Sequence, residues 1–156
     1  GSNLEDQRVL EGAGRNGLGA KITNVFSKLF KVTGYDHTRR VWYELVWTNN
    51  MERCVSQDIR HFNGISWVTP QGVTTTAPVM TRPDGCPPAQ HHHSMVCVSF
   101  DLDFAHLGYQ GQYDRDTYYM LMGMLVEYSF TTKVPFYCNG ALFDYSKPTT
   151  FFEAVF

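Results

Sequence analysis

The chain has 156 residues, a formal net charge of -2 at pH 7, 43% hydrophobic residues and 15% aromatic residues. This composition excludes an intrinsically disordered chain, and the charge gives no overall basic surface that would attract nucleic acid. The length is typical of one domain. We expect residues 1–17 to hold a cloning remnant, a short helix and a glycine-rich connector, and residues 18–156 to form a single β-rich domain with an N-terminal helix.

The stretch from Gly12 to Gly17 (GAGRNG) matches the pattern GxGxxG, opens a helix, and is followed by Asp36 nineteen residues after its last glycine. Glycines in this pattern let a pyrophosphate approach the backbone at a helix N-terminus. The dinucleotide-binding fold also requires a buried strand before the motif, and residues 7–11 (QRVLE) are too polar for one. The favoured interpretation is therefore a flexible connector.

Residues 18–31 have the apolar period of an amphipathic helix. The apolar positions are Leu18, Ile22, Val25, Phe26, Leu29 and Phe30, and the polar side carries Lys21, Lys28 and Lys31. A helix that covers the core is the favoured interpretation. The alternative is a helix that lies on a membrane or in a partner's groove through Ile22, Val25, Phe26, Leu29 and Phe30.

The rest of the chain shows strand patterns. We expect strands over 41–48, 51–59, 65–69, 94–104, 134–138, 141–145 and 150–156. Asn49-Asn50 and Asn139-Gly140 predict hairpin turns because both pairs tolerate left-handed backbone angles. Residues 73–93 hold four of the seven prolines and are predicted to form a long loop.

The run from Thr117 to Phe130 (TYYMLMGMLVEYSF) is apolar at every even position from Tyr118 onward. Period-two alternation predicts a strand with one buried face, bent near Gly123. Together with 94–104 it would form the core of the fold. The predicted fold class is mainly β: an antiparallel β-sandwich or jelly-roll-like barrel with an N-terminal amphipathic helix packed against it.

The four cysteines are Cys54, Cys86, Cys97 and Cys138, and no CxxC pair occurs among them. This spacing argues against a structural zinc ribbon. The even count favours at least one disulfide in a secreted domain, with the pairing left open.

Three adjacent histidines, His91, His92 and His93, together with His106, are the weak candidates for metal ligands. Adjacent residues of an extended chain point to opposite faces, and no HxH or HExxH pattern supports a site. We favour a solvated loop and expect no cofactor. Asp101, Asp103 and Glu44 are interpreted as the solvent face of a sheet rather than as catalytic carboxylates.

Tyrosines gather near one arginine between residues 109 and 119. Tyrosine and arginine anchor interfaces at low entropic cost. The expected binding residues are Tyr109, Tyr113, Arg115, Tyr118 and Tyr119.

With no catalytic constellation, these patterns favour a non-enzymatic binding domain, extracellular or virion-associated, that recognises a protein or glycan partner through loops and binds no nucleic acid. An amphipathic helix followed by an aromatic β-sandwich resembles the actinoporin-type pore-forming proteins in organisation, without a shared motif. That resemblance implies the first alternative, a membrane-active protein that uses the 18–31 helix. The second alternative is a metal-dependent enzyme that uses the histidine cluster. The oligomeric state is left open.

Overall fold

The computed structural model describes residues 18–79, 94–134 and 136–155, and these divide into two compact units. Unit 1 includes residues 18–79 and 94–110, and unit 2 includes 111–134 and 136–155. The prediction that residues 18–156 form a single domain stays a prediction.

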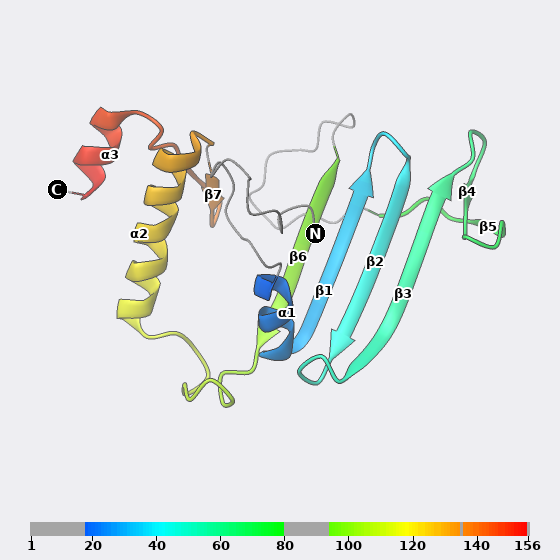
Figure 1. Ribbon diagram of the computed structural model, residues 1–156, viewed down its shortest axis with the longest axis horizontal. Coiled ribbons are helices and arrows are strands. Elements are labelled where there is room, and N and C mark those ends of the chain that lie inside the picture. Colours follow the sequence, from blue (N-terminus) through cyan, green and yellow to red (C-terminus); the bar gives the residue numbers. More distant parts are fainter. Residues whose placement is uncertain (1–17, 80–93, 135, 156) are drawn as a thin grey trace, which may run out of the picture. The chain divides into compact units, whose positions relative to one another are not determined.

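Unit 1 is one antiparallel sheet of six strands preceded by a short helix (Figure 1). Its elements are α1 (Leu18–Val25), β1 (Ser27–Asp36), β2 (Val41–Thr48), β3 (Arg53–Phe62), β4 (Trp67–Val68), β5 (Thr74–Thr75) and β6 (Met95–Leu102). The strand order is β5-β4-β3-β2-β1-β6, so β6 lies at one end of the sheet beside β1. The predicted strand over 41–48, the hairpin at Asn49-Asn50 and the strand over 94–104 are confirmed.

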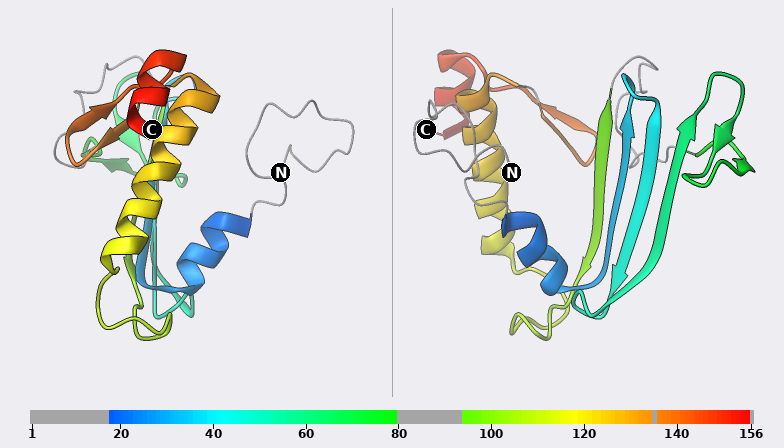
Figure 2. Two further views of the ribbon diagram at one scale, coloured as in Figure 1. Left: turned by 90° about the vertical axis from the view of Figure 1, so that its left-hand side faces the viewer. Right: turned by 45° about the vertical axis from the view of Figure 1, so that its right-hand side comes forward.

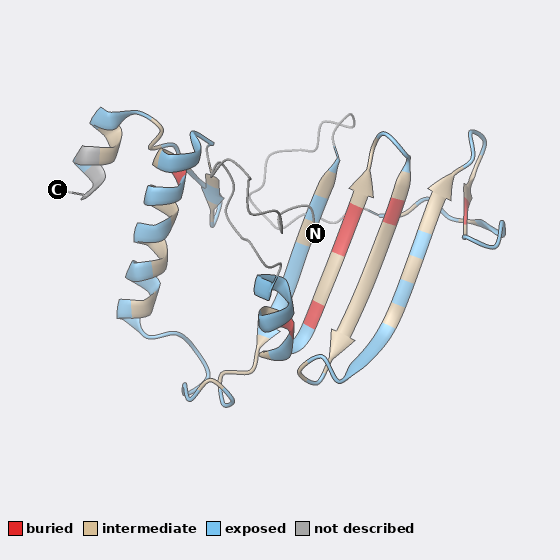
Figure 3. Ribbon diagram, viewed as in Figure 1, coloured by how far each residue is buried: buried red, intermediate tan, exposed pale blue. Residues whose placement is uncertain are grey.

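The core of unit 1 lies on β1 and β2, where the sheet is flanked by strands on both sides (Figure 3). Phe30 and Trp42 are 3% and 4% exposed. The Phe30 ring packs between the rings of Trp47 and Phe100, with centroid distances of 6.1 and 6.5 Å. Aromatic packing across three neighbouring strands therefore holds the centre of the sheet together.

The predicted helix over 18–31 is only half correct, because the chain leaves the helix after Val25 and becomes β1 at Ser27. Val32, Thr33 and Tyr35 favour an extended backbone, and pairing with β2 and β6 stabilises it. Figure 2 shows α1 angled away from the plane of the sheet at the end where β1 begins. Its apolar residues Leu18 and Ile22 are more than half exposed, so the expected packing of this helix on the sheet is wrong.

Unit 2 is mainly helical. It contains α2 (Arg115–Thr132), a hairpin of β7 (Phe136–Cys138) and β8 (Ala141–Phe143), and α3 (Pro148–Val155). The Asn139-Gly140 turn is confirmed, with φ of 50° and 77°. The strand expected over 150–156 is wrong, because Pro148 begins a helix instead, as proline does at a first helical position.

The apolar run 117–130 is a helix, and this overturns the predicted fold class. Asp114 caps α2 by accepting a hydrogen bond from the Thr117 amide at 2.7 Å. Hydrogen bonds from the Thr117 hydroxyl and from its amide lower the pKa of the Asp114 carboxyl. Methionine and leucine, which dominate the run, are strong helix formers. The β-sandwich or jelly-roll-like barrel is therefore wrong, and the chain is a mixed structure of helices and one large antiparallel sheet.

Ser129 connects α2 to the hairpin strand β8 and is fully buried. Its hydroxyl donates to the Phe143 carbonyl at 3.3 Å and accepts from the Tyr145 amide at 2.9 Å. Ser129→Ala leaves both backbone groups without this partner, so we expect unit 2 to lose about 1–3 kcal/mol of stability. Hydrogen exchange of the α2 amides measures this loss. Thr131→Ala, at an exposed position of the same helix, is the control and should cost nothing.

The disulfide expectation is also wrong. Cys54, Cys97 and Cys138 are free thiols. The fourth cysteine, Cys86, lies outside the described residues.

Candidate functional site

Helix α1 presents an exposed N-terminus directly after the glycine-rich sequence Gly12–Gly17. Its first residues, Leu18, Gly19 and Ala20, are exposed, and the first turn contains no acidic side chain. The first amides of a helix have no intrahelical acceptor, and the helix dipole adds partial positive charge there. Lys21 is exposed and adds a full positive charge nearby. This end of α1 has the chemistry of an anion-binding site.

Side chains of α1 and backbone groups of unit 1 fix the other end of the helix. The Thr23 hydroxyl donates to the Gly19 carbonyl at 3.0 Å, and the Ser27 hydroxyl donates to the Thr23 carbonyl at 2.6 Å. The Asp103 amide, just beyond β6, donates to the Phe26 carbonyl at 2.8 Å. The helix therefore leaves the sheet in a defined direction although its apolar side chains are exposed.

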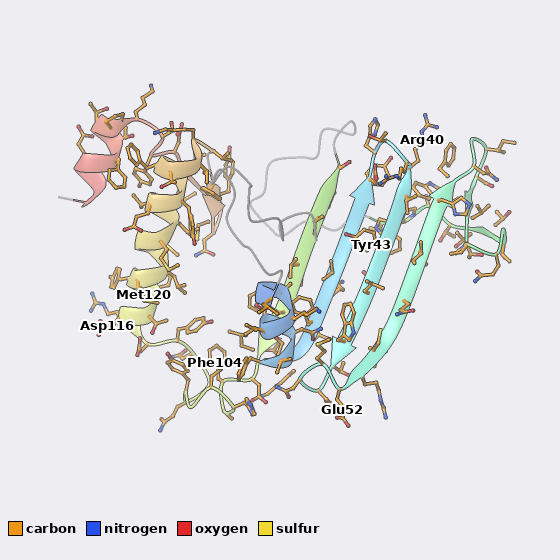
Figure 4. All side chains as sticks on the ribbon, in the orientation of Figure 1. Arg40, Tyr43, Glu52, Phe104, Asp116 and Met120 are labelled. Carbon is orange, nitrogen blue, oxygen red and sulfur yellow. The ribbon has the colours of Figure 1, made fainter. Side chains whose placement is uncertain are left out.

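One face of the sheet is apolar from β6 to β2. Facing residues of paired strands lie on the same side, so the register groups Val96 with Gly34, Val98 with Val32, and Phe100 with Phe30. The β2 residues Tyr43, Leu45 and Trp47 complete these three rows. On β6 the side chains Val96, Val98 and Phe100 are 66%, 47% and 50% exposed. Figure 4 shows Tyr43 on this part of the sheet.

An open cavity of about 380 Å³ lies at the end of this face where β1 ends and β6 begins. Its lining residues are Tyr35, Asp36, Tyr43, Ser94, Met95 and Val96. Mostly apolar walls with a few polar groups are typical of small-molecule sites, and the volume falls in their range.

The opposite face of the sheet is polar and its charges are paired. Lys31 Nζ lies 3.4 Å from Glu44 Oε2. The hydrogen bond to Asp58 raises the pKa of the Arg60 guanidinium, which also lies 5.3 Å from the centroid of the Trp42 ring. These charged groups satisfy one another, and Trp42 is buried on the same face.

The predicted tyrosine and arginine site falls in both units. Tyr109 belongs to unit 1, whereas Tyr113, Arg115, Tyr118 and Tyr119 belong to unit 2. In unit 2, Arg115 lies over the Tyr119 ring at 5.4 Å, and the rings of Tyr118 and Tyr119 are 5.8 Å apart. The assignment of these five residues as a binding site stays a prediction.

Of the four candidate metal ligands, the structure describes only His106. His91, His92 and His93 lie outside the described residues, and His106 packs its ring 5.3 Å from that of Phe26. Within the described ranges no group of three or more histidine, cysteine, aspartate or glutamate residues is placed to hold a metal ion.

The apolar residues of the expected membrane helix are divided between two elements. Ile22 and Val25 lie on α1, Leu29 and Phe30 lie on β1, and Phe26 joins them. None of the helices in the described part of the chain is long and apolar enough to cross a membrane. The five residues therefore do not form one helical surface.

Comparison with known proteins relates the chain to DNA topoisomerases 2, although no family model matches it. It is 38% identical over 66 residues to DNA topoisomerase 2 of Plasmodium falciparum, which covers 42% of the chain and 5% of that protein. It is 47% identical over 51 residues to DNA topoisomerase 2 of Invertebrate iridescent virus 6, covering 33% of the chain and 4% of that protein. The chain thus spans about a twentieth of the length of these relatives.

The fold resembles that of an ATPase region. The crystal structure of the ATPase region of Saccharomyces cerevisiae topoisomerase II matches with a TM-score of 0.68 and 22% identity. The match covers 98% of the chain and 33% of that structure. The same region bound to dexrazoxane matches equally well.

These similarities correct the functional predictions. The extracellular or virion-associated binding domain with a protein or glycan partner is wrong, because the similar proteins are DNA topoisomerases. The expectations of no nucleic acid partner and of a secreted protein are wrong for the same reason. The interpretation of residues 12–17 as a connector stays a prediction, because these residues lie outside the described part of the chain.

Proposed function

We propose that this chain is a nucleotide-binding segment of the ATPase region of an enzyme related to DNA topoisomerase 2, which acts on DNA and uses ATP. The N-terminus of α1, with the glycine-rich sequence before it, receives the phosphate groups. One observation carries the proposal: Gly12–Gly17 runs directly into a helix whose first turn is exposed, lacks acidic side chains and is followed by Lys21. The likeness to an ATPase region supports the same assignment.

The charge and the backbone of α1 suit a triphosphate. Its first-turn amides donate hydrogen bonds, and glycine at position 19 keeps side-chain atoms away from the approaching oxygens. A Cβ atom built on Gly19 meets no protein atom within 4 Å. The protein itself thus leaves room for a side chain at this position, and a ligand gives a reason for the glycine.

Gly19→Ala tests whether the glycine serves ligand binding or the stability of the helix. Alanine is the better helix former, so the variant should be as stable as the original chain or more stable by up to about 1 kcal/mol. If a phosphate contacts this turn, the added methyl group should raise the ATP dissociation constant about tenfold, equivalent to about 1.4 kcal/mol. Isothermal titration with Mg-ATP measures the affinity, and thermal unfolding measures the stability.

Gly123→Ala is the matched control. Gly123 lies within α2, and a Cβ atom there also meets nothing within 4 Å. It should give the same gain in helix stability and leave ATP affinity unchanged. Unchanged affinity in Gly19→Ala, or no saturable ATP binding by the original chain, would contradict the proposal.

A further inference from the structure

The turn between β1 and β2 carries two adjacent arginines, Arg39 and Arg40, and both are exposed. Arg40 has a φ of 53°, in the left-handed region that a residue with a Cβ atom adopts at a steric cost. Glycine or asparagine would occupy this position with less strain. The turn itself therefore gives no reason for an arginine here, and strained backbone of this kind is concentrated at functional positions.

The Arg40 guanidinium is held in place without being neutralised. Its Cζ atom lies 5.7 Å from the centroid of the Phe62 ring. Phe62 is fixed in turn, because its amide donates to the Arg40 carbonyl at 3.0 Å and its ring lies 5.8 Å from that of Trp67. Among the described residues no carboxylate forms an ion pair with Arg40. An ordered side chain with an unpaired charge loses little conformational entropy when it binds an anion.

The neighbouring Arg39 is oriented by Asp36, which ends β1. The Asp36 carboxylate accepts hydrogen bonds from the amides of Thr38 and Arg39 at 2.9 and 3.1 Å, and Arg39 Nη1 lies 3.2 Å from its Oδ2. The bond from the Arg39 amide is the main cause that lowers the pKa of the Asp36 carboxyl. The Arg39 side chain nevertheless remains 81% exposed. The turn thus presents two guanidinium groups to solvent against one carboxylate that is already hydrogen-bonded.

This arrangement suits a phosphate backbone. A planar guanidinium binds a phosphate through two parallel hydrogen bonds. The formal net charge of -2 does not oppose such a contact, because exposed charges are screened beyond about 8 Å at physiological salt. Figure 4 shows Arg40 at the tip of the β1–β2 turn, at the end of the sheet away from Glu52. A projecting turn reaches an extended polyanion without needing a cavity in the protein.

We propose that the β1–β2 turn binds the phosphate backbone of duplex DNA through Arg40 and Arg39. The choice of DNA as the polyanion rests on the proposed function, whereas the anion-binding chemistry rests on the turn itself. The turn follows β1 and α1 precedes it, so this contact is separate from the nucleotide site (Figure 1). Phosphate contacts position a protein on DNA without reading its sequence, so the contact should be independent of sequence.

Arg40→Asn tests this role, since asparagine tolerates the left-handed backbone and carries no charge. The unfolding temperature should stay the same or rise. The dissociation constant for a fluorescent duplex oligonucleotide, measured by anisotropy, should rise about fivefold, the upper range for one exposed ion pair. The salt dependence should also weaken, with the slope of log affinity against log salt smaller by about 1, because one phosphate contact is lost. Arg40→Gly, which also accepts this backbone, replaces Arg40→Asn if that variant does not fold.

Arg53→Gln is the matched control. Arg53 is also exposed, begins β3 beside Glu52 and lies at the other end of the sheet. The substitution removes the same charge and should leave DNA affinity and its salt slope unchanged. Asp36→Asn should act in the opposite direction to Arg40→Asn. Asparagine still accepts the turn amides but no longer pairs with Arg39, so DNA binding should tighten about twofold.

The DNA contact is overturned if the original chain does not bind the duplex, or if Arg53→Gln weakens binding as much as Arg40→Asn. An unchanged salt slope in Arg40→Asn also contradicts it. If poly-glutamate competes with the duplex at equal charge concentration, the turn binds acidic peptides and DNA is the wrong partner. Titration of the same variants with Mg-ATP should give one unchanged affinity. If the original chain binds no ATP, the proposed function fails, and the anisotropy measurement still decides the DNA contact.

Discussion

Phe30→Ala is expected to lower the free energy of unfolding of unit 1 by about 3–5 kcal/mol, the cost of removing a buried phenylalanine from a packed core. Phe30 is 3% exposed and packs between the aromatic rings of Trp47 and Phe100. All three tryptophans of the chain, Trp42, Trp47 and Trp67, lie on strands of this sheet. Denaturant unfolding followed by tryptophan fluorescence therefore reports on unit 1 directly.

Leu29→Ala is the control for this substitution. Leu29 is the neighbour of Phe30 on β1, faces the other side of the sheet and is 43% exposed. Its loss should cost less than about 1 kcal/mol. Equal losses for the two variants would show that the face carrying Phe30 is not the core of unit 1.

Gly34→Ala is expected to destabilise unit 1 by about 1–3 kcal/mol through overpacking. The Tyr43 ring lies across Gly34, and a Cβ atom at position 34 would lie 2.3 Å from Tyr43 Cζ and 2.5 Å from Cε1. The ring must move off the strand to admit the methyl group. Without the Tyr43 ring, Gly34→Ala should stabilise unit 1 instead, because glycine in a strand interior is otherwise about 0.5–1 kcal/mol less stable than alanine.

A double-mutant cycle with Tyr43→Ala measures this coupling. In the Tyr43→Ala background, Gly34→Ala should be neutral or stabilising, and the same tryptophan-monitored unfolding gives all four free energies. If Gly34→Ala lowers the free energy of unfolding equally in both backgrounds, the Tyr43 ring is not the reason that position 34 requires glycine.

The strands of unit 1 were predictable where polar and apolar residues alternate. From Val96 to Phe104 every even position is apolar, and the odd positions include Ser99, Asp101 and Asp103, so the strand period is clear. The Asn139-Gly140 turn was predictable because its two residues accept the backbone angles that a tight hairpin requires.

The run 117–130 was mispredicted because its few residues that are not apolar, Thr117, Gly123, Glu127 and Ser129, all fall at odd positions and imitate the period of a strand. Two local signals were available. Met120, Leu121, Met122, Met124 and Leu125 are strong helix formers, and Asp114 stands at a helix-capping distance before Thr117. The converse error occurred at residues 26–31, where helical spacing continued by coincidence into residues that β1 places on both faces of the sheet.

The glycine pattern of the proposed site is visible in the sequence, but how strongly it predicts a phosphate-binding site depends on the surrounding fold. The pattern GxGxxG predicts a dinucleotide site only where a parallel sheet precedes the helix, and the strand patterns of this chain indicate antiparallel pairing. An antiparallel sheet with an exposed helix N-terminus provides the same phosphate-binding chemistry without that fold.

The position of β6 links stability to protein concentration. It is a terminal strand of the sheet, with β1 as its single partner among the described strands, and it carries the most exposed apolar side chains of the sheet face. Open backbone groups beside exposed valine and phenylalanine form a template for edge-to-edge aggregation. Association along this strand would add to the free energy of unfolding by mass action, so the melting temperature of the isolated chain should rise with its concentration until the chain precipitates.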